Sequence, residues 1–127
     1  MDYYDDLEIR DPEERQQAQF AALSGQIAHA RRNAPYFARL LKEFEPNEVR
    51  DRKALARLPV TRKSDLIGLQ RTDPPFAGMT AVATGALGRV FCSPGPIYDP
   101  QGARGDFWRF GRALHAAGFC RGDLVDN

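Results

Sequence analysis

The segment from Gly88 to Asn127 constrains the fold most, because its pattern changes from strand to turn to helix and back to strand. The predicted elements follow one another directly: a strand at 89–92, a proline-rich turn at 93–100, a helix at 103–117 and a second strand at 124–127. In α/β enzymes the turn after the first strand of such a unit holds phosphate groups. We therefore expect a parallel strand pair joined by a crossover helix, and with it an α/β fold.

The N-terminal half predicts helices that are separated by prolines. Asp11 is expected to cap the first helix, because Pro12 and two glutamates follow it. This helix should run to about Arg32, where an Ala-Pro pair ends it. Its apolar residues recur at helical spacing and predict one buried stripe: Phe20, Leu23, Ile27 and Ala30.

Weaker signals describe the rest of this half. Residues 1–10 are expected to form a flexible or surface-draped arm, and Ser24-Gly25 to mark a close packing contact. Shorter helical pieces are predicted at 35–44, 51–58 and 62–70, the last one capped by Thr61.

In the C-terminal half, Gly118 is expected to end the helix at 103–117.

The stretch Asp73-Pro74-Pro75 reads as a rigid linker between two regions. We therefore predict an N-terminal helical region at 1–72 and the start of an α/β nucleotide-binding domain at 73–127. Two short strands do not make a stable sheet by themselves. The chain is expected to be the front of a larger protein, or a domain that completes its sheet by association with itself as a homo-oligomer such as a dimer.

Composition excludes several classes of protein. Of the 127 residues, 43% are hydrophobic and 28% are charged, which favours a folded chain over disorder. A net charge of +1 supplies no general field that would attract nucleic acid or an anionic membrane. No apolar run approaches the ~20 residues that span a bilayer. We therefore expect neither a nucleic-acid partner nor a membrane association.

The two cysteines, Cys92 and Cys120, are too few for a disulfide framework or a zinc site. The acidic N-terminus lacks the basic and apolar parts of a signal peptide, so a cytoplasmic location is expected. In that compartment both cysteines should be reduced thiols. The apolar neighbours of Cys92 predict that its thiol is buried and inert.

A resemblance rests on the order and spacing of several blocks of sequence. These blocks are 31–37 (Arg-Arg-Asn-Ala-Pro-Tyr-Phe), 55–66, 89–95 and 113–127. Together they resemble the N-terminal part of the phenylacetate–coenzyme A ligase family, adenylate-forming enzymes related to coenzyme F390 synthetases. The resemblance runs from about Asp11 to Asn127 and covers only the front part of a family member.

The resemblance implies a reaction and its cofactors. A full-length family member activates a small aryl or acyl carboxylic acid with ATP and Mg²⁺, forms an acyl adenylate, and passes the acyl group to coenzyme A. This chain alone should lack ligase activity and hold none of these cofactors tightly, because the family's later adenine, ribose, carboxylate and lid residues are absent. The alternative is a non-catalytic module, or an inactive ligase remnant, that self-associates through an open sheet edge.

The family's phosphate loop, Ser-Ser-Gly-Thr-Thr-Gly-Lys, falls on the proline-rich turn. Only Ser93 and Gly95 agree with it, and the resemblance implies that these two are the nucleotide-binding residues. Pro94 and Pro96 remove N–H donors from an anion-binding turn. Asp99 replaces the family's lysine and reverses a charge beside a polyanion. The loop should therefore not grip a triphosphate in the ordinary family manner, and no catalytic residue or metal ligand is predicted.

Other polar and aromatic residues are expected to be structural. His29 and His115 lack a nearby acid or nucleophile in the sequence, so both are predicted to be surface or interhelical histidines. Asp106-Phe107-Trp108 favours core packing over a pocket, because aromatics at helical spacing usually pack inward. The basic stretch from Arg50 to Lys63 contains interleaved acids, which favours a solvated face over a nucleic-acid or coenzyme A phosphate patch.

Overall fold

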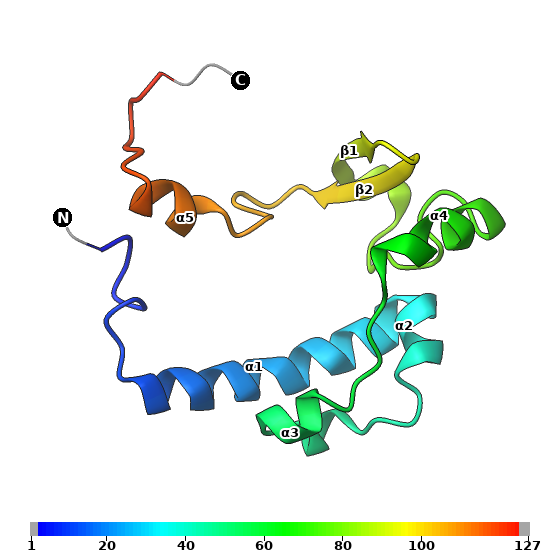
Figure 1. Cartoon of the computed structure of the whole chain (residues 1–127), viewed down its shortest axis with the longest axis horizontal. Coiled ribbons are helices and arrows are strands. Elements are labelled where there is room, and N and C mark those ends of the chain that lie inside the picture. The colour runs from blue at the N-terminus through cyan, green and yellow to red at the C-terminus, as the bar shows by residue number, and fades with distance from the viewer. Residues whose placement is uncertain (1–2, 125–127) are drawn as a thin grey trace.

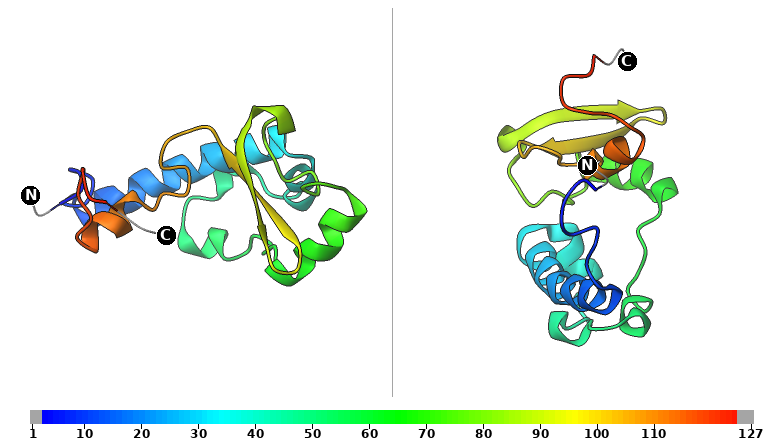
Figure 2. Two further views of the ribbon diagram at one scale, coloured as in Figure 1. Left: turned by 90° about the horizontal axis from the view of Figure 1, so that it is seen from above. Right: turned by 90° about the vertical axis from the view of Figure 1, so that its left-hand side faces the viewer.

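This computed structural model describes residues 3–124. Its longest element is the helix α1 (Pro12–Asn33), and the other elements are arranged around it (Figure 1). A β-hairpin lies on one side of α1 and the short helix α3 (Arg52–Leu55) on the other (Figure 2). The N-terminal arm and α5 (Gly111–Ala116) lie together near the first turns of α1. Helices and one small sheet thus make an α/β arrangement.

The boundaries of α1 follow from its sequence and confirm the prediction. The Asp11 carboxylate accepts hydrogen bonds from the main-chain N–H groups of Glu13, at 2.8 Å, and Glu14, at 3.2 Å. The helix ends at Asn33, one residue beyond the expected position. Ile27 is buried, and the other stripe residues are half-buried: Phe20, Leu23 and Ala30.

A small hydrophobic core fixes the next elements against α1. Its buried members are Ile27, Leu41, Val49 and Ala54, and partly buried apolar residues surround them: Leu23, Phe37, Leu40, Phe44 and Leu58. The chain reaches these positions through α2 (Pro35–Leu40), a 3-10 turn η1 (Pro46–Glu48) and α3. Asp51 caps α3, since its carboxylate accepts a hydrogen bond from Ala54 N–H at 2.7 Å.

Two details of this region correct the sequence interpretation. Gly25 marks no close contact: it is exposed, and an added Cβ would find open space. Thr61 does not cap α4 (Lys63–Thr72), because the residue at the N-cap position is Arg62. The Thr61 hydroxyl lies 3.1 Å from the Tyr36 hydroxyl instead, so it links the segment before α4 to α2.

The strands form an antiparallel hairpin, which corrects the predicted parallel pair. After the 3-10 turn η2 (Thr84–Ala86), β1 (Leu87–Ser93) pairs with β2 (Ile97–Gly102), and Cys92 lies opposite Tyr98. Three turn residues separate the strands. So short a connection can reverse the chain but cannot carry a crossover helix. Residues 97–100, predicted as part of the turn, are therefore strand residues.

The buried side chain of Gln70 attaches the hairpin to α4. Its amide Nε2 donates a hydrogen bond to the Tyr98 carbonyl at 2.8 Å, and Tyr98 N–H donates one to Gln70 Oε1 at 2.9 Å. Both main-chain polar groups of Tyr98 therefore point away from β1. Gln70 is only 7% exposed, and this pairing satisfies its amide on both sides.

The two edges of the hairpin differ. The main-chain groups of alternate strand residues face the same edge, so those of Pro100, like those of Tyr98, face away from β1. The missing N–H of Pro100 therefore removes no hydrogen bond between the strands. Gln70 and Pro100 thus close the β2 edge. Val90 and Cys92 lie opposite Pro100 and Tyr98, so their main-chain groups face outward along β1. That edge is open, and Cys92 is exposed rather than buried.

The C-terminal part is less regular than predicted. Only Gly111–Ala116 of the expected helix at 103–117 is helical, and turns and bends occupy 103–109. Gly118 ends this helix as predicted, with φ +95°, and Phe119 N–H donates to the Leu114 carbonyl at 3.0 Å. Of the predicted strand at 124–127, Leu124 is not in a strand, and residues 125–127 lie outside the described residues.

The N-terminal arm is draped over α5, one of the two predicted arrangements. Arg112 of α5 forms ion pairs with Asp5 and with Glu8. The Tyr4 ring stacks edge-on against His115, with 5.7 Å between ring centroids, and lies under the Arg112 guanidinium. Between residues 3 and 124, no helix combines the length and the apolar character needed to cross a membrane.

Candidate functional site

The predicted phosphate loop is the turn of the β-hairpin. Ser93 ends β1, and its hydroxyl donates a hydrogen bond to the Ile97 carbonyl at 3.4 Å, across the turn. Gly95 lies at the tip of the turn with φ +141°, a conformation that favours glycine. A Cβ at this position would lie 3.4 Å from Ile67 Cδ1, so the turn packs against α4. The nucleotide-binding role of Ser93 and Gly95 stays a prediction.

The turn offers little to a triphosphate. Of its three central residues, Pro94, Gly95 and Pro96, only Gly95 carries a main-chain N–H. A phosphate-binding turn needs several successive N–H donors. No cluster of three or more His, Cys, Asp or Glu side chains suited to a metal occurs among the described residues. The centre of the turn between β1 and β2 thus supplies one main-chain donor, fewer than a phosphate-binding turn uses.

A cavity lies beside the hairpin, with a volume of about 470 Å³. Four parts of the chain form its wall: α1 through His29, the stretch 79–82, the hairpin, and the loop that carries Phe107 and Trp108. Apolar side chains supply most of the lining, including Met79, Val82, Leu87, Pro100, Phe107 and Trp108. An apolar cavity with a few polar groups at its wall suits a small organic group.

The aromatic residues of this wall correct the predicted core position. Trp108 is 53% exposed, and its indole Nε1–H donates a hydrogen bond to Gln101 Oε1 at 2.9 Å. Its ring makes edge-to-face contacts with Phe107, at 5.0 Å between centroids, and with Phe91, at 6.4 Å. Hydrophobic spacing alone could not show this arrangement, because these residues are not helical and the partners come from different elements.

The histidine at the wall of this cavity is bonded within its own helix. His29 is exposed, and its Nδ1 lies 3.0 Å from the side-chain nitrogen of Asn33, one turn later on the same helix. His115 stacks on Tyr4 at the other end of α1. Neither histidine shows a hydrogen bond to a carboxylate among the described residues, and a general base needs such positioning. The prediction of surface or interhelical histidines fits both positions.

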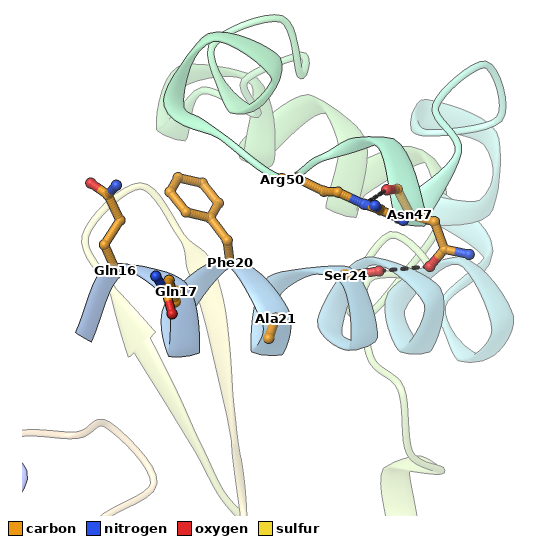
Figure 3. A pocket seen from close by; sticks show the side chains of 7 residues that line it. All are labelled: Gln16, Gln17, Phe20, Ala21, Ser24, Asn47 and Arg50. Carbon is orange, nitrogen blue, oxygen red and sulfur yellow. Dashed lines mark hydrogen bonds between the residues drawn. The ribbon is translucent and has the colours of Figure 1, made fainter. Parts of the chain in front are cut away.

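A second cavity lies between α1 and η1, also with a volume of about 470 Å³ (Figure 3). Its wall combines polar side chains with apolar surface, and Phe20 is the one aromatic side chain drawn. The Ser24 hydroxyl donates a hydrogen bond to Asn47 Oδ1 at 3.1 Å, and Arg50 Nε donates to the Asn47 carbonyl. The first bond holds α1 to η1, and the second holds Arg50 against η1, so these groups are engaged in structure. The basic side chains from Arg50 to Lys63 are exposed, as the predicted solvated face requires.

Comparisons with known proteins give structural matches. No protein-family model and no curated protein matches the chain. A 2-hydroxyisobutyryl-CoA ligase in the postadenylation state, in complex with 2-HIB-AMP, matches at 27% identity with a TM-score of 0.66. An open conformation of this ligase, in complex with 2-HIB-AMP and CoA, matches at 28% identity with a TM-score of 0.65. The chain resembles part of an adenylate-forming coenzyme A ligase.

The match covers most of this chain but only a small part of the ligase. Both structures match 72% of this chain, whereas the chain spans 20% of the length of the ligase. The adenylate-forming ligase superfamily that the sequence resembles is thus supported by a likeness in structure. The finer assignment, to the phenylacetate–coenzyme A ligases, goes beyond this likeness.

Proposed function

We propose that this chain is the N-terminal part of an acyl- or aryl-coenzyme A ligase-like protein of the phenylacetate–coenzyme A ligase type. Full-length proteins of this type activate a small carboxylic acid with ATP and Mg²⁺ as an acyl adenylate, and then form a thioester with coenzyme A. The observation that carries the proposal is the likeness to a ligase whose structures hold 2-HIB-AMP, in one case together with CoA.

We propose also that the chain alone does not form adenylates. The hairpin turn has one main-chain N–H among its three central residues, and Asp99 stands where the family has a lysine. The division into a helical region at 1–72 and an α/β region at 73–127 belongs to the same proposal. In it, the Gln70–Tyr98 pair joins the two regions. A cytoplasmic location stays a prediction.

An exchange assay tests the lack of activity. The purified 127-residue chain is incubated with ATP, Mg²⁺, labelled pyrophosphate and a panel of aryl and acyl carboxylates that includes 2-hydroxyisobutyrate. We expect no carboxylate-dependent label in ATP, while an intact adenylate-forming ligase in the same buffer gives it. Carboxylate-dependent exchange by the chain would contradict this part of the proposal.

A chimera tests separately whether the segment can replace that of the ligase and whether its altered phosphate loop prevents activity. The chain replaces the matching segment of 2-hydroxyisobutyryl-CoA ligase, once unchanged and once with the family loop restored. The restored version carries Pro94→Ser, Pro96→Thr, Ile97→Thr, Tyr98→Gly and Asp99→Lys. We expect both chimeras to fold and only the restored one to regain exchange. If the restored chimera folds but stays inactive, the segment is not equivalent to that of the ligase.

A second candidate function is a non-catalytic module that associates with itself as a homo-oligomer. The open β1 edge favours it, because the outward groups of Val90 and Cys92 offer a template for another strand. The side chains of Val90 and Phe91 are also 49% and 47% exposed. Edge pairing of two copies would give these outward main-chain groups hydrogen-bond partners.

A further inference from the structure

Four arginines surround one cavity at the end of the molecule where the arm meets α5. The cavity has a volume of about 470 Å³, and its guanidinium groups belong to Arg10, Arg15, Arg109 and Arg112. They come from the N-terminal arm, the first turn of α1, the loop before α5 and α5 itself. Figures 1 and 2 show these segments meeting at the same end of α1. We call this space the arginine cavity.

Among the residues that line the arginine cavity, positive charges outnumber negative ones. Glu8 is the one acidic residue among the described residues that line it, and Asp5 pairs with Arg112 from outside the wall. Four guanidinium groups against two carboxylates leave two positive charges. Like charges in one small space repel each other, so an anion would stabilise this arrangement.

Main-chain carbonyls hold two of the guanidinium groups in place. Arg15 Nη2 donates hydrogen bonds to the carbonyls of Glu8, at 3.0 Å, and Arg10, at 3.2 Å. Arg10 Nε donates to the Leu7 carbonyl at 3.2 Å. Each guanidinium has five N–H donors, so each keeps donors for a ligand. Arg10, Arg15 and Arg112 are half-buried, which limits their freedom to turn into solvent.

Arg109 differs from the other three. Its backbone has φ +57°, a left-handed conformation that is uncommon for residues other than glycine. Its main-chain N–H donates to the Asp106 carbonyl at 3.0 Å, which fixes the loop. Among the described residues, no hydrogen bond or ion pair engages its side chain. Arg109 thus brings an uncompensated guanidinium to the wall of the cavity.

We propose that the arginine cavity binds the phosphate group of a small molecule. The guanidinium fork matches two phosphate oxygens at once, and charge-assisted hydrogen bonds of this kind are the strong ones. Inorganic phosphate, pyrophosphate and a phosphate ester such as that of coenzyme A share this chemistry. The proposal does not rest on the ligase function, because the cavity is built from residues outside the hairpin turn.

Calorimetric titration of the full chain at low ionic strength tests the proposal. The probes are inorganic phosphate, pyrophosphate, coenzyme A and dephospho-coenzyme A. We expect binding that Arg109→Ala weakens about tenfold, the loss of one or two charge-assisted hydrogen bonds. The matched control is Arg104→Ala, an exposed arginine in the same loop that does not line the cavity, and it should leave binding unchanged.

The probes also separate the possible sources. A preference for coenzyme A over dephospho-coenzyme A identifies a phosphate ester as the ligand, whereas tightest binding of pyrophosphate or phosphate identifies a free anion. If Arg109→Ala fails to fold by circular dichroism, Arg10→Gln tests the same cavity with the same expected loss. The proposal is overturned if no probe binds at millimolar concentration, or if Arg104→Ala weakens binding as much as Arg109→Ala.

Discussion

At the scale of single residues, Gln70 shows how one side chain sets the position of a whole element. The amide is the right group at this position because it presents a donor and an acceptor together, as a strand backbone does. A glutamate has no donor for the Tyr98 carbonyl, and a leucine has neither partner. The position of the hairpin against α4 therefore depends on the identity of Gln70 as well as on its burial.

Gln70→Leu should lower the free energy of unfolding by about 1–3 kcal/mol, because it leaves the N–H and the carbonyl of Tyr98 without their partners. Urea denaturation followed by circular dichroism measures the change. Gln17→Leu is the matched control, since Gln17 is an exposed residue of α1. Equal stability of the two variants would mean that the Gln70 pairing contributes nothing to the fold.

At the scale of elements, caps and prolines determine where the helices begin and end. Asp11→Ala removes the acceptor for two N–H groups at the start of α1, so we expect a loss of about 1 kcal/mol. Thermal unfolding measures this loss as a lower Tm. Asp6→Ala, which changes an exposed carboxylate of the arm, serves as the control. A Tm unaffected by Asp11→Ala would show that the N-terminal turn of α1 is held by its packing alone.

The ends of α1 were predictable because their signals are local, whereas the pieces predicted at 35–44 and 51–58 are helical only over α2 and α3. The Asp11 cap and the Ala34-Pro35 pair gave α1 to within one residue, and the stripe around Ile27 gave its buried side. The late start of α5, at Gly111 rather than at the predicted residue 103, was not predictable in this way. The Asp106 carboxylate accepts hydrogen bonds from Phe110 N–H at 2.8 Å and Gly111 N–H at 3.0 Å, a local pattern that competes with a continuous helix.

The hairpin and the cavities were harder to predict, for a different reason. Pro100 made residues 97–100 look like a turn, whereas proline is tolerated at a strand position that faces outward. The sequence located a turn after Ser93 but made it too long, and its weakness as a phosphate loop stays a prediction. It could not identify the arginine cavity, because Arg10 and Arg109 meet only through the tertiary fold.

At the scale of the whole molecule, the unequal edges of the hairpin direct any association. If two copies pair through β1, the wild-type chain should sediment as a dimer, and Val90→Lys should make it a monomer, because lysine on an edge strand opposes pairing. Val60→Lys is the control, since Val60 is also an exposed valine, far along the chain from the hairpin. Analytical ultracentrifugation decides the outcome, and a monomeric wild type would exclude this candidate function.

The ion pair between Asp5 and Arg112 joins residues that are 107 positions apart. During synthesis on the ribosome, the arm therefore emerges long before the helix that it will contact. Tyr4, Asp5 and Glu8 cannot contact Arg112 until it has been synthesised, whereas α1 and the small core can already form. Closing so long a loop is entropically costly, and an already ordered α1 would shorten the distance that remains to be closed. We therefore expect the arm to be among the last parts of the described chain to reach its place.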